Sequence, residues 1–134
     1  PLFDRFIARH RVAAWSESLE SALTLARSEA MTRGEPVSVK AISSGWSDGW
    51  VVFRDEDADG AVDSGEILRV WREAPAGIEV KGIAADESVV FYRTGTSATE
   101  RHFQIGHFSA GPKSISCVSL ARSGHISHVR AACH

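Results

Sequence analysis

Residues Leu19–Gly34 read LESALTLARSEAMTRG, and their pattern sets the first element of the fold. Apolar side chains recur there at three- and four-residue steps, at Leu19, Ala22, Leu23, Ala26 and Ala30. This spacing places them on one face of an α-helix, while the charged side chains fall elsewhere on the helical wheel. The small alanines let another layer of structure approach closely. The stretch therefore predicts an amphipathic helix with one side facing the core.

The helix is expected to begin near Leu2 and to end near Arg33. Gly34 suits a left-handed helix cap, and Pro36 cannot continue the helix. A helix of roughly 30 residues is about 45 Å long, which is more than a domain of this size can cover. We therefore expect its first half to project beyond the globular part and to expose apolar side chains, namely Leu2, Phe3, Phe6, Ile7, Val12 and Trp15. Such a surface implies a partner. The alternative is a helix broken near residues 9–11 into two packed pieces.

The sequence after Pro36 is typical of strands. Short apolar or alternating segments are separated by turn signals at nearly regular spacing, with no second helical pattern. A helix followed by a run of strands predicts an α+β fold with antiparallel sheets. We expect a single domain, with the helix in residues 1–34 and the β-rich part in residues 35–134. The expected strands are residues 37–42, 49–53, 67–71, 78–81, 89–92, 102–108, 114–120 and 126–129.

The overall composition leaves the partner class open. The chain has 134 residues, enough for one domain with a real core. Its formal net charge of −2 neither favours nor excludes any class of partner. No apolar run approaches the ~18 residues needed to span a bilayer. Because the chain begins with Pro1 at an uncapped, aromatic-rich helix, we expect that a preceding hydrophobic segment has been removed.

The two cysteines, Cys117 and Cys133, lie near the C-terminus. A disulfide between them would close a C-terminal loop, contribute roughly 3 kcal/mol to stability and imply an oxidising compartment. The alternative is two free thiols in a cytosolic protein. Neither cysteine has the Cys-x-x-Cys spacing of a zinc or redox site.

Several of these features together resemble a known family. They are the segment 25–30 (LARSEA), Arg33-Gly34 before Pro36-Val37, the Gly49-Trp50 pair that opens a strand ending in an acidic stretch, Ser119 to Gly124, and the terminal cysteine. Over essentially the whole chain this pattern is similar to the GspH/FimT family of minor pilins and pseudopilins. Residues 3–11 resemble the stretch just after a pilin's transmembrane segment.

The resemblance implies a type IV pilin-like fold and a structural function. Members are made as prepilins, and a hydrophobic N-terminal half-helix sits first in the inner membrane and later in the filament core. This chain would be the soluble periplasmic fragment, without that half-helix. Its exposed residues Leu2, Phe3, Phe6 and Ile7 would pack against helices of neighbouring pilins. The location implied is the bacterial inner membrane with a periplasmic domain, and then a cell-surface pilus or a periplasmic pseudopilus.

The sharpest chemical motif is the acidic segment from Asp55 to Glu66. Asp55, Asp57, Asp59, Asp63 and Glu66 fall at positions one, three, five, nine and twelve of a calcium-loop pattern, and Gly60 falls at its turn. Calcium is therefore a candidate cofactor. The flanking segments read as strands rather than helices, so we favour an acidic hairpin tip without metal. Any calcium site is expected to be weak, on the order of 0.1 to 1 mM.

A second candidate is a basic strip near the C-terminus, formed by Lys113, Arg122, His125, His128 and Arg130. In the FimT branch the resemblance implies DNA binding through a glycine-arginine-x-arginine motif. His125 and Ser127 stand here where the motif has its two arginines. Phosphate attraction would therefore rest on Arg122 and Arg130, with histidines contributing only under mildly acidic conditions. The alternative is a solvated strand face.

Other residues carry less chemistry. His102 and His107 are five residues apart, so they point to opposite faces of a regular strand, and we favour surface histidines over a metal site. Trp46, Trp50 and Trp71 are expected to be core or sheet-face aromatics. The sequence has no nucleophile elbow, phosphate-binding loop or zinc-protease motif, so we interpret the protein as a non-enzyme.

The leading hypothesis is a minor pilin of a type IV pilus that joins the tip complex, primes assembly and takes part in adhesion or DNA uptake. The alternatives are an H-type pseudopilin of a type II secretion system and a DNA- or calcium-binding module.

Overall fold

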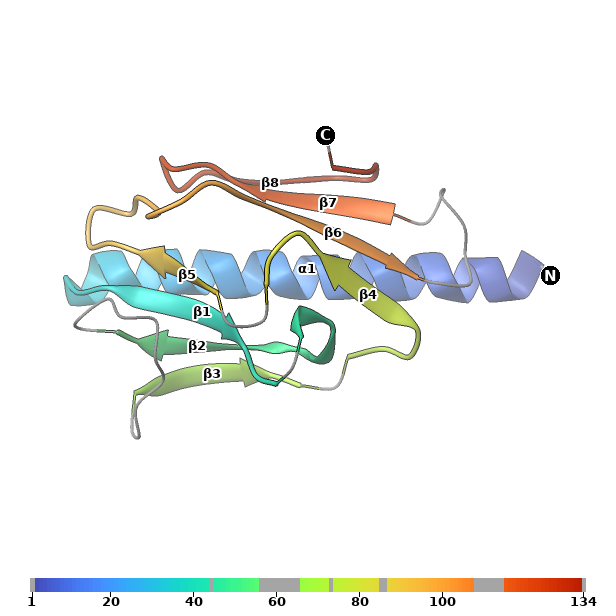
Figure 1. Cartoon of the computed structure of the whole chain (residues 1–134), viewed down its shortest axis with the longest axis horizontal. Helices are drawn as coiled ribbons and strands as arrows, with labels where there is room; N and C mark the ends of the chain where they lie inside the picture. Colours follow the sequence, from blue (N-terminus) through green and yellow to red (C-terminus); the bar gives the residue numbers. More distant parts are fainter. Residues whose placement is uncertain are drawn as a thin grey trace.

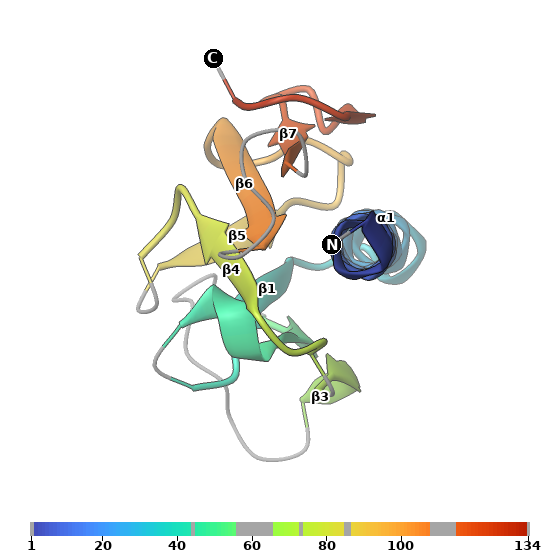
Figure 2. The same cartoon turned by 90° about the vertical axis from the view of Figure 1, so that its right-hand side faces the viewer.

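The structure is a computed structural model that describes residues 2–43, 45–55, 66–72, 74–84, 87–107 and 115–133. One long helix, α1 (Leu2–Arg33), runs the length of the molecule and lies against one side of the β-structure (Figures 1 and 2). It is continuous through residues 9–11, so the alternative of two packed pieces is wrong. Gly34 ends it with a φ of 70° and donates its N–H to the Ala30 carbonyl at 2.9 Å.

The described strands form two four-stranded sheets in which all neighbours are antiparallel. The first sheet has the order β3-β2-β1-β5, and the second has the order β4-β6-β7-β8. Helix α1 contacts strands of both sheets. The predicted α+β class, with one long N-terminal helix packed on antiparallel sheets, is confirmed. The strand bounds are β1 (Val37–Ala41), β2 (Trp50–Arg54), β3 (Ile67–Trp71), β4 (Ile78–Lys81), β5 (Ser88–Phe91), β6 (Arg101–His107), β7 (Ile115–Leu120) and β8 (Ile126–Val129).

The predicted stripe on α1 is the helix side of the core. Leu19, Ala22, Leu23, Ala26 and Ala30 all have no exposed surface. They pack with fully buried residues of both sheets, namely Val37, Val39, Val52, Phe91, Phe103, Ile105, Val118 and Leu120. The alanines let the strands approach the helix axis, so one helix closes the core of both sheets.

Two predicted features differ in detail. A short 3-10 helix, η1 (Trp46–Asp48), lies between β1 and β2, in a stretch for which the sequence predicted no helix. Val12 and Trp15, which we expected on the projecting part of α1, are only 3% and 6% exposed. The reason is that Trp15 packs against Trp50, with 4.5 Å between the ring centroids, so the sheets cover more of the helix than its length suggested.

The predicted aromatic roles hold for the described tryptophans. Trp46 and Trp50 are buried, and the Trp46 ring lies 5.2 Å from Phe103 between centroids. Trp71 is half-buried at the end of edge strand β3, where the Arg69 guanidinium lies 4.6 Å from the centre of its ring. Within the described residues no helix combines the length and the apolar character needed to cross a membrane.

Candidate assembly surface

Among the described residues, the large apolar side chains with the highest exposed fractions lie at the N-terminal end of α1. Leu2, Phe3 and Phe6 are 80%, 71% and 68% exposed, and Ile7 is half-buried. Figure 1 shows this end of the helix projecting past the strands. From Ala8 onwards the same helix buries one face against the sheets. The end of α1 is therefore an apolar surface that the described part of the chain does not cover.

A groove of about 570 Å³ lies beside this helix end. Leu2 and Phe6 line it from α1, and Ile115 lines it from the start of β7. Three basic side chains, Arg9, His10 and Arg130, stand among these apolar groups. The lining of the groove therefore combines apolar side chains with basic ones.

The opposite end of α1 is fastened to two turns. Arg27 donates its Nε–H to the Gly95 carbonyl at 2.8 Å. Gly124, with a φ of 92°, packs against both groups: a Cβ placed there would lie 1.9 Å from the Gly95 oxygen and 2.6 Å from Arg27 Nε. The Ser97 N–H also donates to the Arg122 carbonyl at 2.9 Å. The turn after β5 and the turn between β7 and β8 are thus joined to each other and to the helix.

The described residues of the predicted basic strip are spread along β8 and the segments on either side of it. Arg122 and His125 belong to the turn that precedes β8, whereas Arg130 follows the strand and lines the groove beside the helix end. His128 faces α1, where its Nδ1 is 2.7 Å from the Glu20 carboxylate and its side chain is only 17% exposed. Lys113 lies outside the described residues. The described side chains therefore do not form one continuous basic face.

Only the two ends of the predicted calcium loop fall within the described residues. Asp55 is 1% exposed, and its Oδ2 accepts a hydrogen bond from Ser38 Oγ at 2.9 Å. The Glu66 carbonyl accepts the Arg54 N–H at 2.9 Å, which continues the pairing of β2 with β3. Asp57, Asp59 and Asp63 lie outside the described residues. Among the residues that the structure does describe, no group of three metal-ligating side chains comes together.

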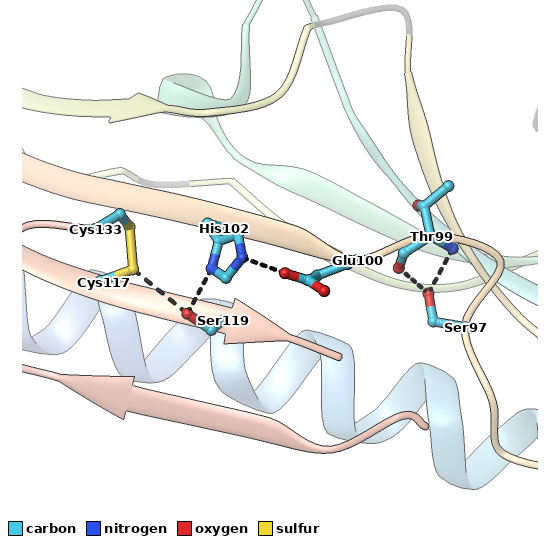
Figure 3. A network of polar contacts seen from close by, with 7 residues as sticks. All are labelled: Ser97, Thr99, Glu100, His102, Cys117, Ser119 and Cys133. Carbon is cyan, nitrogen blue, oxygen red and sulfur yellow. Dashed lines mark hydrogen bonds and ion pairs between the residues drawn. A yellow bond between two sulfur atoms is a disulfide. The ribbon is translucent and has the colours of Figure 1, made fainter. Parts of the chain in front are cut away.

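The outer face of the second sheet holds a polar chain that the sequence reasoning missed (Figure 3). His102 and Ser119 are directly opposite in the β6–β7 ladder, and His102 Nδ1 is 2.9 Å from Ser119 Oγ. His102 Nε2 is 2.8 Å from the Glu100 carboxylate. Ser119 Oγ also lies 3.5 Å from Cys117 Sγ, which forms a disulfide with Cys133. Only the strand register, which the sequence does not reveal, brings these residues together.

Comparisons with known proteins agree with this architecture. The family model described as Type II transport protein GspH matches residues 16–124. No curated protein sequence matches the chain.

Solved structures with the same fold include the type IV minor pilin FimU of Pseudomonas aeruginosa strain PAO1, in two crystal forms. Both are 26% identical to this chain, with TM-scores of 0.65 and 0.67. The matches cover 87% and 95% of this chain, and 91% of the FimU chain in each case.

The minor pseudopilin EpsH of the Vibrio cholerae Type 2 Secretion System also has this fold. Its TM-score is 0.63 at 12% identity, over 89% of this chain and 96% of the EpsH chain, which establishes a shared fold and no more. The family match covers most of the chain, and the minor pilin FimU has the same fold at 26% sequence identity. The chain belongs to the GspH/FimT family of type IV minor pilins and type II secretion pseudopilins.

Proposed function

We propose that this protein is a minor pilin, a structural subunit of a type IV pilus that takes part in pilus assembly and in the tip complex. The observation that carries the proposal is the change in burial along α1. From Ala8 to Ala30 the helix buries one face against the sheets, but its first turns present Leu2, Phe3 and Phe6 to solvent. The likeness to FimU, a type IV minor pilin, supports the pilus as the assembly concerned.

In this mechanism the helix end docks between the helices of neighbouring pilins. Burying a large apolar side chain contributes about 1.5–3 kcal/mol, so three such residues supply a substantial share of an assembly contact. Ridge-into-groove packing of helices gives the contact its geometry. The two sheets then face outward from the filament, where loops are available for adhesion. The protein would act first at the inner membrane with its β-domain in the periplasm, and later at the cell surface.

The test compares two substitutions on the same helix, introduced into the chromosomal gene of the host. Phe6→Asp adds a carboxylate to the exposed apolar end, and Ser21→Asp adds the same group to an exposed position over the sheets. We expect Phe6→Asp to lower the number of assembled pili at least about tenfold, which corresponds to the loss of 1.4 kcal/mol or more at the contact. Ser21→Asp should assemble normally, and neither change should alter the melting temperature of the purified chain. Normal piliation with Phe6→Asp would contradict the proposal.

The alternative is an H-type pseudopilin of a type II secretion system. The description of the matching family favours it, and it would use the same helix surface in a periplasmic pseudopilus. Deleting the gene separates the two systems: loss of surface pili with normal export of folded proteins supports the pilus, and the reverse supports secretion. Neither function involves a chemical reaction, so both assign the protein a structural role.

Calcium and DNA binding stay predictions from the sequence. Calorimetric titration of calcium into chelator-stripped protein tests the first. A final calcium concentration of about 5 mM lies above the dissociation constants of extracellular calcium modules. Asp57→Ala is the control for a heat signal that belongs to the loop. DNA binding through Arg122 and Arg130 would weaken steeply with salt, so a titration of duplex DNA at two salt concentrations tests it, with Arg122→Ala as the variant.

A further inference from the structure

The disulfide on the outer face of the second sheet is in contact with a chain of three polar side chains (Figure 3). Cys117 and Ser119 are two residues apart on β7, so both point to the same face of the sheet. Ser119 Oγ is the link, because it lies 3.5 Å from Cys117 Sγ and 2.9 Å from His102 Nδ1. Glu100 completes the chain at 2.8 Å from His102 Nε2. The carboxylate is therefore connected to the sulfur through an imidazole and a hydroxyl.

The protonation state of His102 decides where the Ser119 hydroxyl donates its single hydrogen. A neutral imidazole that donates Nε2–H to Glu100 leaves Nδ1 as an acceptor, and the hydroxyl hydrogen then points to Nδ1. An imidazolium donates from both nitrogens, so Ser119 Oγ accepts from Nδ1–H and its own hydrogen is free to point to Cys117 Sγ. The Ser119 hydroxyl can therefore donate a hydrogen bond to Cys117 Sγ when His102 is protonated, but not when His102 is neutral.

The two sulfur atoms differ in access. Cys117 is 3% exposed, whereas Cys133 is half-buried and lines a cavity of about 400 Å³. His102 and Glu100 also line this cavity, and so do Lys81 and Arg101. Lys81 Nζ is 3.1 Å from the Glu79 carboxylate, and Arg101 is 2.7 Å from that of Glu87. A thiolate from outside would therefore reach Cys133 through a cavity with basic groups at its edge, and Cys117 would be the leaving group.

We propose that Cys117–Cys133 is a site of thiol–disulfide exchange with a dithiol, and that Ser119 and His102 supply a proton to the departing Cys117. The dithiol's thiolate attacks Cys133 Sγ, the Cys117–Cys133 bond breaks, and Cys117 leaves with the electron pair. Cys117 Sγ takes the Ser119 hydroxyl proton, which His102 replaces from Nδ1. The second thiol of the reductant then gives up its proton and displaces Cys133, so the dithiol is oxidised to a disulfide and both protein cysteines are reduced.

A carboxylate, a histidine and a serine also form the catalytic triads of serine hydrolases, but the surroundings of the serine differ here. Here the hydroxyl belongs to a residue of strand β7 that is paired with β6 on one side and with β8 on the other. Its further neighbour is a disulfide sulfur. The geometry points to protonation of that sulfur rather than attack on an acyl group.

Opening the disulfide would release the end of the chain after β8. This segment includes Arg130, which lines the groove beside the exposed end of α1. The Cys133 N–H donates to Gln104 Oε1 at 3.1 Å, and this hydrogen bond also holds the segment to β6. That reduction of this disulfide affects assembly into a pilus rests on the proposed function, whereas the thiol–disulfide exchange itself does not.

The experiment measures how fast dithiothreitol reduces the disulfide of the purified, oxidised chain. Each rate is divided by the concentration of dithiothreitol thiolate, because that concentration changes with pH. Ser119→Ala removes the link, and Ser127→Ala, which changes the serine opposite Ser119 on β8, is the matched control. We expect Ser119→Ala to be reduced about fivefold more slowly than wild type near pH 6, the effect of one ordinary hydrogen bond. Histidine side chains change charge between about pH 5 and 8, so the ratio should shrink towards one near pH 8. Ser127→Ala should follow wild type.

A second variant keeps the test decisive if Ser119→Ala alters the fold. His102→Asn removes the proton donor but keeps the hydroxyl, and its normalised rate should lose the advantage at low pH. Circular dichroism establishes that each variant is folded before reduction. Equal normalised rates for wild type, Ser119→Ala and His102→Asn, or a ratio that is the same near pH 6 and pH 8, would overturn the proposal. Because the assay uses the isolated chain, its result is independent of whether the protein assembles into a pilus.

Discussion

The two ends of α1 have similar apolar content but opposite surroundings. Leu2, Phe3 and Phe6 are more than two-thirds exposed, whereas Leu19 and Leu23 have no exposed surface at all. The buried part alternates leucine with alanine, so strands of both sheets can approach the helix. The exposed end carries bulky side chains and no alanine stripe. Hydrophobicity alone therefore does not distinguish a folding surface from an assembly surface, but the size of the neighbouring side chains does.

The largest effect is expected from shortening a buried leucine. Leu23→Ala should lower the free energy of unfolding by about 2–5 kcal/mol, because it removes transfer energy and leaves a cavity between α1 and the sheets. Leu2→Ala, the same chemical change at the exposed end, should cost less than about 0.5 kcal/mol. Urea unfolding of both variants measures the difference. Equal losses would show that the two ends of the helix are packed alike.

A smaller effect is expected where the buried part of the helix is fastened to the turns. Gly124→Ala would place a Cβ 1.9 Å from the Gly95 oxygen at a positive φ of 92°. Gly34→Ala is the matched control, because its φ of 70° is also positive but no atom lies within 4 Å of the added Cβ. We expect about 1 kcal/mol of destabilisation for Gly34→Ala from backbone strain alone, and roughly 2–3 kcal/mol for Gly124→Ala. Thermal unfolding compares them, and similar values would mean that the turn moves freely away from Arg27.

The contact between α1 and β8 tests the middle of the helix. Glu20→Gln keeps the size of the side chain that meets His128 Nδ1 at 2.7 Å but removes its charge. Glu20 is 33% exposed, so we expect a loss of only about 0.5–1 kcal/mol near neutral pH. Glu17→Gln, at an exposed position on the same helix, should be neutral. A double-mutant cycle with His128→Ala isolates the pair, and zero coupling energy would show that the contact adds nothing to the docking of β8.

The local sequence pattern was sufficient to predict the helix and the approximate position of every described strand. The reason is that the spacing of apolar side chains, every 3.6 residues in a helix and every two in a strand, depends only on residues close in sequence. It failed where distant segments meet. Val12 and Trp15 were expected to be exposed from helix length alone, but Trp50, 35 positions after Trp15 in the numbering, covers the ring. The Glu100–His102–Ser119 chain depends on the β6–β7 register, which single-sequence reasoning does not supply. Gly124 is special through its approach to Gly95 and Arg27, which no turn signal reveals.

The smallest effect on folding is expected at Phe6, and it locates the boundary between the two parts of the helix. Phe6 is 68% exposed, and Ala8, two residues later, is 3% exposed. Phe6→Ala should therefore change the free energy of unfolding of the isolated chain by no more than about 0.5 kcal/mol, although a buried phenylalanine would lose about 3–5 kcal/mol. Phe103→Ala, which truncates a fully buried ring of β6, provides that reference in the same unfolding assay. A loss above about 1 kcal/mol for Phe6→Ala would mean that the ring packs into the groove beside Ile115 and serves the fold of its own chain. A negligible loss would leave the ring available for a neighbouring subunit and would place the change from folding to assembly between Phe6 and Ala8.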